Sequence, residues 1–236
     1  LAGVLYLVVV ATGIFSLAYV PSQINVANDP AATANNIVLS ASLFRFGIAS
    51  FMLEQVAFLL LPLVLYRLFR STHPTAAVLM VALAVASIPI ALVSVSHRLD
   101  ALALLTDARF SQSFAPAQLQ GLATLSLEAY GNGLLAARLF WGLWLLPFGF
   151  LVLKSGFLPK LLGVLLMLGC LGYLVNVFGE LLVPHYFDTW IANYAGLPAA
   201  VGEIGTCLWL LLVGARQSKG GVARGSTRDG SSSEVD

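Results

Sequence analysis

Residues 161–182 read LLGVLLMLGCLGYLVNVFGELL, an apolar run in which Glu180 is the one charged residue. A helix rises about 1.5 Å per residue, so a run of this length reaches across a hydrocarbon core about 30 Å thick. Soluble domains rarely contain even one such run. The stretch therefore predicts a helix that crosses a membrane.

Five further runs share this length and apolar character, and the composition of the whole chain agrees with them. Of the 236 residues, 59% are hydrophobic and 10% are charged, whereas soluble domains average about 25% charged residues. We therefore predict an all-α polytopic membrane protein, a bundle of six transmembrane helices with short helices on its outer surface. The other five predicted spans are residues 1–20, 48–68, 76–96, 134–153 and 197–213.

The domain organisation follows from the same contrast. Residues 1–215 hold all six apolar runs and form the predicted transmembrane domain. Residues 216–236 are rich in Gly and Ser, a composition that cannot bury enough apolar surface to offset the entropy of ordering. We expect this segment to be a disordered cytoplasmic tail.

Two proline signals predict helices outside the spans. Asp29 and Pro30 combine a capping side chain with a proline in the first turn, which predicts a short helix over residues 31–39. Pro116 has the same position before residues 117–130. We expect the second helix to lie on the outer surface and to run into the fourth span.

The distribution of Lys and Arg predicts the orientation. With a cytoplasmic N-terminus, the inner segments hold eight basic residues and the outer segments hold four, on longer stretches. The positive-inside rule then places both termini in the cytoplasm. The inner residues are Arg67, Arg70, Lys154, Lys160, Arg216, Lys219, Arg224 and Arg228, and the outer ones are Arg45, Arg98, Arg109 and Arg138.

Four ionisable side chains lie within the predicted spans, where each costs about 2.5–3.5 kcal/mol on insertion scales. They are Glu54, Arg138, Glu180 and Glu203. With the orientation above, all four lie in the outer half of the bundle. Such a cost must be offset by pairing or by a water-filled cavity, so each of these residues is a candidate for function.

Spacing places some of these groups on common helical faces. In the fifth span, Gly169, Tyr173, Asn176 and Glu180 recur at intervals of four, three and four residues, which is one face of a helix. A polar face turned toward lipid would be unpaired, so we expect this one to turn inward. By the same spacing Gly47, Ser50 and Glu54 share a face of the second span.

These observations predict one polar pocket that opens to the outer side. Glu54, Glu180 and Glu203 would converge there, and Arg138 would pair with one or two of the carboxylates. Tyr173 and Asn176 would complete the lining, and the pocket would bind or move a small molecule, an ion or a proton. The alternative is a structural or accessory subunit whose buried charges only fix helix packing.

A membrane-embedded, metal-assisted enzyme is a second alternative, and it rests on fewer observations. His97 and His185 are metal-ligand types, but the sequence has no His-Glu-x-x-His motif. It also lacks a phosphate-binding loop and a Gly-x-Ser-x-Gly motif. We therefore predict no cofactor and favour a protein that is not an enzyme.

Few partners follow from the sequence. The net charge of +1 gives no field that would attract nucleic acid. The predicted partners are the lipid bilayer and a small molecule or ion. The sequence leaves the ligand and the oligomeric state open.

Several stretches resemble one family of bacterial membrane proteins, domain of unknown function 4386. The most specific is KSGFLPK at residues 154–160, in which Gly156 suits a left-handed helix cap and Pro159 suits the next helix start. The resemblance implies a six-span helical bundle in a bacterial inner membrane, without an assigned activity, and its pattern includes Glu203. The other matching stretches are residues 1–7, 162–163, 172–174, 202–203 and 208–211.

Overall fold

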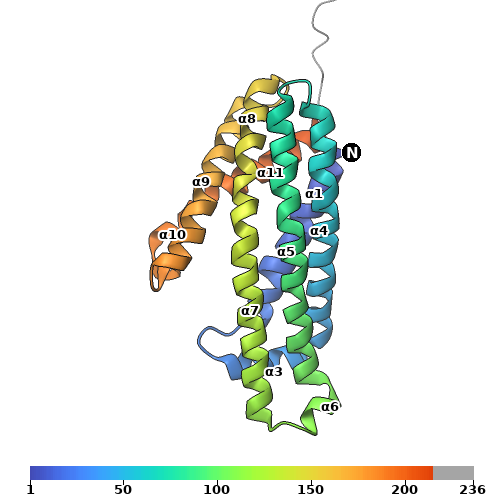
Figure 1. Cartoon of the computed structure of the whole chain (residues 1–236), viewed down its shortest axis with the longest axis vertical. Coiled ribbons are helices and arrows are strands. Elements are labelled where there is room, and N and C mark those ends of the chain that lie inside the picture. Colours follow the sequence, from blue (N-terminus) through green and yellow to red (C-terminus); the bar gives the residue numbers. More distant parts are fainter. Residues whose placement is uncertain (215–236) are drawn as a thin grey trace, which may run out of the picture.

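The computed structural model describes residues 1–214, and each regular element in that range is a helix (Figure 1). Six of the helical stretches are long and apolar enough to cross a membrane. The predicted all-α, multi-pass fold is confirmed. The six spans are Ala2–Ile24, Ala41–Phe69, Pro74–Thr106, Pro116–Ser155, Lys160–Leu182 and Trp190–Leu212.

Three of the spans are built from more than one helix. The first consists of α1 (Ala2–Gly13), the π-helical segment η1 (Ile14–Tyr19) and α2 (Val20–Ile24). The fourth consists of α7 (Pro116–Leu143) and α8 (Leu145–Ser155), which meet at Trp144. The last, Trp190–Leu212, consists of α10 (Trp190–Ala195) and α11 (Leu197–Leu212). The remaining elements are α3 (Pro30–Leu39), α4 (Ala41–Phe69), α5 (Pro74–Thr106), α6 (Ala108–Ser111), α9 (Lys160–Leu182) and η2 (Tyr186–Asp188).

The helix boundaries bear out the predicted start and stop signals. The Asp29 side chain accepts a hydrogen bond from the Ala32 amide at 2.8 Å, and α7 begins at Pro116. Gly156 ends α8 with φ of 73°, the left-handed conformation expected of a glycine cap. The predicted tail, residues 216–236, lies outside the described residues.

The helices differ in length, and this difference divides the molecule along its axis. The α9 helix has 23 residues, or about 35 Å, which is close to one bilayer crossing. The α5 helix has 33 residues, or about 50 Å, and continues with α4 and α7 well past the end of α9 (Figure 1). We call the far end, which carries α3 and α6, the extended end.

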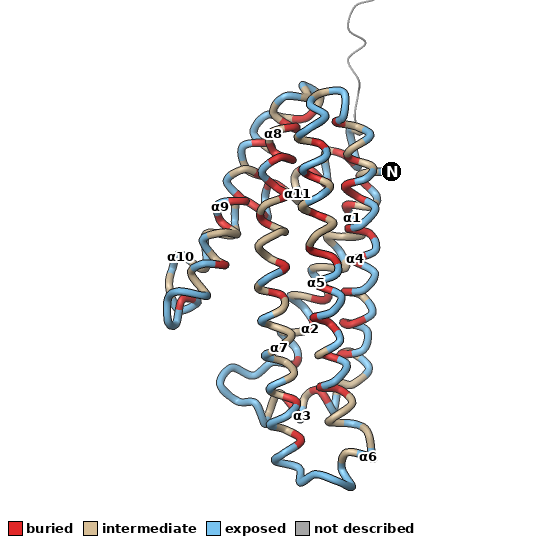
Figure 2. Tube along the Cα trace, in the orientation of Figure 1, coloured by how far each residue is buried: buried red, intermediate tan, exposed pale blue. Residues whose placement is uncertain are grey.

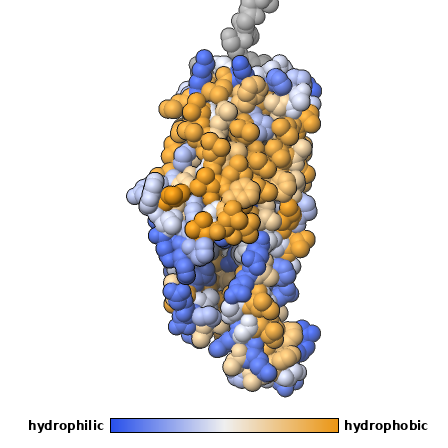
Figure 3. Space-filling model, turned by 60° about the vertical axis from the view of Figure 1, so that its left-hand side comes forward, coloured by the Kyte–Doolittle hydropathy of each residue, from blue (hydrophilic) through white to orange (hydrophobic). Residues whose placement is uncertain are grey.

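The surface follows this division. Large apolar side chains are exposed along the spans, among them Leu53, Val56, Leu60 and Leu63 on α4. Apolar residues cover the upper part of the face seen in Figure 3, whereas its lower part mixes hydrophilic with apolar residues and is hollowed. An apolar belt of this kind fits the hydrocarbon of a bilayer, and the extended end is the part that projects from it.

Buried residues recur along the helices of the bundle (Figure 2), and their side chains form two apolar clusters. The first surrounds Leu61, Leu65 and Trp144, and the second surrounds Ile48 and Phe51 nearer the extended end. On α4 a polar pair, Glu54 and Gln55, lies between the two clusters and is buried. Glu54 and Gln55 are thus held between two packed apolar layers.

Close packing of α8 on α9 gives a first test of this fold. A Cβ atom added at Gly163 would lie 2.7 Å from the Gly149 carbonyl oxygen, whereas one added at Gly121 meets nothing within 4 Å. We expect Gly163→Ala to lower the free energy of unfolding by about 1–3 kcal/mol through overpacking. Gly121→Ala, the matched control, should be neutral or stabilising by up to about 1 kcal/mol. Thermal unfolding of the purified protein in detergent measures both, and equal melting temperatures would contradict the α8–α9 contact.

Candidate functional site: an acidic cavity inside the bundle

Glu54 projects from α4 toward the first span and is 8% exposed. Ser16 donates a hydrogen bond from Oγ to Glu54 Oε2 at 3.3 Å. On the same span, a Cβ atom added at Gly13 would lie 3.2 Å from Glu54 Oε1. A small residue and a hydroxyl thus leave room for the carboxylate and hold it in place.

The predicted polar face of α4 packs along this span. Ser50 donates a hydrogen bond to the Thr12 carbonyl at 3.3 Å, and Gly47 lies against Val20. Ser16 belongs to the π-helical segment, in which the helix carries a wider turn. Segments of this kind are frequent at functional sites. Here the segment places a hydroxyl opposite Glu54.

Glu54, Tyr173 and Glu203 line a common space. Two adjoining cavities of about 110 Å³ and 280 Å³ have these three residues in their walls. Counted from the ends of α4, α9 and α11 that lie away from the extended end, the three residues are about 14–22 Å deep at 1.5 Å per residue. This depth places the space near the middle of a 30 Å core. The two cavities also share Val9, Phe58 and Trp144.

Aromatic rings form much of the wall. Phe58 meets Trp144 edge-on at 5.1 Å between ring centroids, and Trp144 stacks on Phe148 at 5.1 Å. Tyr6 also lines the larger cavity, and its buried hydroxyl has no hydrogen-bond partner among residues 1–214. The cavity therefore combines two carboxyl groups, several aromatic faces and an unused hydroxyl.

The larger cavity reaches the lateral surface of the bundle. Its rim includes Ile14 on the first span and Ile204 on α11, whose side chains are 56% and 41% exposed on the bundle surface. Nearer the chain termini the same two spans are in contact, since a Cβ atom at Gly3 would lie 2.6 Å from the Leu211 amide nitrogen. Part of the cavity wall thus lies at the lateral surface of the bundle, between the first span and α11.

The predicted pairing of Arg138 with a carboxylate is present for Glu180, which does not line the cavity that holds Glu54 and Glu203. Arg138 Nη1 lies 2.9 Å from Glu180 Oε2, and the two side chains are 34% and 30% exposed. Among residues 1–214, no ion pair joins Arg138 to Glu54 or Glu203. Along α9, Glu180 lies two helical turns nearer the end of the helix than Tyr173, which does line the cavity.

The stripe on α9 has several neighbours instead of one. Tyr173 faces the cavity, but the Asn176 Oδ1 atom accepts a hydrogen bond from the Tyr186 hydroxyl at 2.8 Å. Gly169 packs on Ala199. Asn176 thus helps to fix the turn after α9, whereas Glu180 joins α9 to α7, and neither lines the two cavities.

The two histidines considered as metal ligands, His97 and His185, each lie near one acidic side chain. His97 lies 3.5 Å from Asp100, and His185 lies 3.8 Å from Asp188, each within its own turn of chain. No group of three or more His, Cys, Asp or Glu side chains within residues 1–214 is arranged to hold a metal ion.

A protein-family model covers the same residues as the helical bundle. The family model described as "Domain of unknown function (DUF4386)" matches residues 1–214, which is all of the described bundle. The chain belongs to the DUF4386 family. This membership confirms the resemblance drawn from the 154–160 motif.

One curated relative of this DUF4386 protein is an "Uncharacterized protein" of Archaeoglobus fulgidus. It is 31% identical over 93 residues, which cover 39% of this chain and 53% of the archaeal protein. The chain thus spans about half the length of that relative. No solved structure matched the chain.

Several residues around the cavity of the DUF4386 protein were not predicted. Tyr6, Phe58 and Trp144 are apolar or aromatic residues inside apolar runs, so the sequence gives no signal that separates them from the core. Ser16 could have been found, because it is a hydroxyl residue about midway along the first span. Its partner could not, since the π-helical turn that directs it toward Glu54 has no sequence signature.

The Arg138–Glu180 pair can be tested by a double-mutant cycle. We expect Arg138→Gln and Glu180→Gln each to lower the free energy of unfolding, because each leaves one charge unpaired at the edge of the bundle. The double variant should recover part of the loss, with a coupling energy of about 0.2–1 kcal/mol for a pair that is one-third exposed. Chemical unfolding in detergent measures the four proteins. Strictly additive losses would show that the two groups do not interact.

Proposed function

We propose that this membrane protein binds a small organic cation in the cavity between Glu54 and Glu203. The observation that carries the proposal is the pairing of two carboxyl groups with a lining that includes no Lys, Arg or His. A carboxylate inside a membrane is stable when a counter-charge accompanies it. The lining supplies none, so a bound cation supplies it.

The aromatic walls support an organic cation over a metal ion. A quaternary or protonated amine within about 6 Å of an aromatic face is attracted by the ring quadrupole, most strongly by Trp. Phe58, Trp141, Trp144 and Tyr173 present such faces in the cavity. A bare metal ion would instead need several oxygen ligands in a small sphere, and no such group exists within residues 1–214.

The position of the larger cavity at the lateral surface supports a ligand that partitions into lipid. Ile14 and Ile204 form an apolar rim, so a cation with an apolar body can pass between the first span and α11 from within the bilayer. The carboxyl groups then meet its charge, and the aromatic walls meet its body. Such a site serves either to bind the cation or to pass it across the membrane.

A structural role is the second candidate, and the Ser16–Glu54 hydrogen bond favours it. This bond joins α4 to the first span across 38 residues of sequence. A scaffold of this kind would need Glu54 for folding and would not respond to cations. The metal-assisted enzyme has no comparable observation and is not proposed.

We further propose a bacterial inner membrane with both termini in the cytoplasm. Arg67, Arg70, Lys154 and Lys160 all lie at the end of the bundle away from α3 and α6. The positive-inside rule assigns that end to the cytoplasm. The extended end then faces the outer side.

Cation binding is tested with phenyltrimethylammonium and its uncharged isostere, tert-butylbenzene. Because Trp141 and Trp144 line the cavity, binding should change tryptophan fluorescence in the purified protein. We expect saturable binding of the cation and an at least tenfold weaker affinity in Glu54→Gln and Glu203→Gln, a difference of about 1.4 kcal/mol. Asp100→Asn, at an exposed position on α5, is the control and should bind like the wild type.

The outcomes separate the two candidates. Equal responses to the cation and the isostere, or no response of the folded wild type, would overturn the cation site. If Glu54→Gln then unfolds at a lower temperature, the scaffold is the better account. Loss of cation binding in variants that keep the wild-type melting temperature supports the site.

Orientation is tested by cysteine labelling in intact cells. Both native cysteines, Cys170 and Cys207, are buried, whereas Ser71 and Ser113 are exposed at opposite ends of the bundle. We expect a membrane-impermeant maleimide to label Ser113→Cys from outside and to label Ser71→Cys only after the cells are broken. The reverse pattern would place the termini outside.

A further inference from the structure

Arg98 lies on α5 in the extended end and is 4% exposed. It is about 36 Å along the helix from Pro74, at 1.5 Å per residue, and so lies past a 30 Å hydrocarbon layer. Its guanidinium carbon is 4.5 Å from the ring centroid of Phe44 and 5.1 Å from that of Tyr130. Two aromatic faces therefore fix the group from α4 and α7.

This buried cation has no acidic partner. The ion pairs within residues 1–214 do not include Arg98, and its Nη1 atom is buried without a hydrogen-bond partner there. Nearby arginines differ. Arg138 pairs with Glu180, and hydrogen bonds from the Arg109 side chain lower the pKa of Asp107 to about 2. An unpaired buried charge is strongly destabilising. A bound anion would supply the partner that the buried Arg98 guanidinium lacks.

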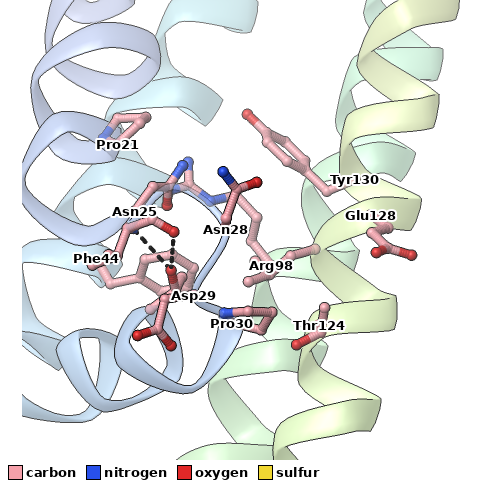
Figure 4. A pocket seen from close by; sticks show the side chains of 13 residues that line it. Pro21, Asn25, Asn28, Asp29, Pro30, Phe44, Arg98, Thr124, Glu128 and Tyr130 are labelled. Atoms are coloured by element: carbon pink, nitrogen blue, oxygen red, sulfur yellow. Dashed lines mark hydrogen bonds between the residues drawn. The ribbon is translucent and has the colours of Figure 1, made fainter. Parts of the chain in front are cut away.

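The side chain of Arg98 reaches into a cavity. The cavity has a volume of about 340 Å³ and is separate from the acidic one, since their linings share no residue. Figure 4 shows Arg98 running from α5 toward the loop between α2 and α3, which forms one wall with Asn25 and Asn28. That loop is held by a hydrogen bond from the Val26 amide to Thr33 Oγ1 at 2.9 Å.

We propose that this cavity binds a small monocarboxylate with an apolar body. A guanidinium presents parallel N–H donors that match the two oxygens of a carboxylate, and the Asn25 and Asn28 amides add donors at the wall. Pro21, Phe44 and Leu127 give apolar surface for the rest of the molecule. The site does not rest on the proposed cation cavity.

The remaining charges of the lining decide between anions. Asp29 and Glu128 also line the cavity, and Asp29 is occupied in capping α3. With Arg98 they give a net charge of −1, from one positive and two negative groups. A doubly charged phosphate or sulfate is repelled more than a monocarboxylate. Among anions, the lining therefore disfavours a doubly charged ligand relative to a singly charged one.

The probe is 3-phenylpropionate, measured by calorimetry on the full-length protein in detergent, with 3-phenylpropionamide and inorganic phosphate as comparison ligands. We expect the carboxylate to bind and the amide and phosphate to bind at least tenfold more weakly. Arg98→Lys keeps the charge but loses the paired donors and should weaken binding at least tenfold. Arg45→Gln, at an exposed arginine of α4 near the same end, is the control and should leave binding unchanged.

A stability measurement separates a ligand site from a structural arginine. If Arg98 awaits a ligand, Arg98→Met should abolish carboxylate binding while the ligand-free protein melts at or above the wild-type temperature. A much lower melting temperature of Arg98→Met, or equal binding of acid and amide by the wild type, would overturn the proposal. Stronger binding of phosphate than of the acid would overturn the assignment to a carboxylate.

Discussion

A hydrocarbon layer about 30 Å thick has no water to satisfy polar groups, and the organisation of the molecule follows from this constraint. Within that layer the spans expose apolar side chains and turn Glu54, Tyr173 and Glu203 toward one another. Beyond it, the longer helices α4, α5 and α7 continue into an end that mixes hydrophilic with apolar residues and has its own cavity (Figures 1 and 3). The same bundle thus holds two separate cavities, one lined by two carboxyl groups and one by a buried guanidinium.

Packing explains why each site keeps its charge. The acidic cavity lies where two apolar clusters meet, so rigid aromatic rings prevent its walls from collapsing. Arg98 is kept between Phe44 and Tyr130, whose faces hold the guanidinium without neutralising it. In both cavities, the packing around a buried ionisable side chain offsets the unfavourable free energy of burying it. Natural proteins commonly accept such a loss of stability at functional sites.

Helix length and polar spacing could be predicted from the sequence, whereas the partners across helices could not. The apolar runs located all six spans, and the spacing of Gly47, Ser50 and Glu54 located a real packing face. Arg138 was expected to pair with one or two of Glu54, Glu180 and Glu203, and its partner within residues 1–214 is Glu180 alone. The Arg98 cavity was missed because α5 runs on to Thr106, past the end of the predicted 76–96 span, and no stop signal or repeat marks where a helix leaves the membrane.

The wide turn at Ile14–Tyr19 has a further effect on the first span. An ordinary helix turns by about 100° per residue, so one additional residue in a turn rotates everything after it by roughly that angle. The stretch before the turn presents Gly13 to the carboxylate, and the stretch after it presents Val20 and Ile24 to the apolar cluster of the extended end. Because of this rotation, one span presents a small residue to Glu54 and apolar residues to the cluster near the extended end.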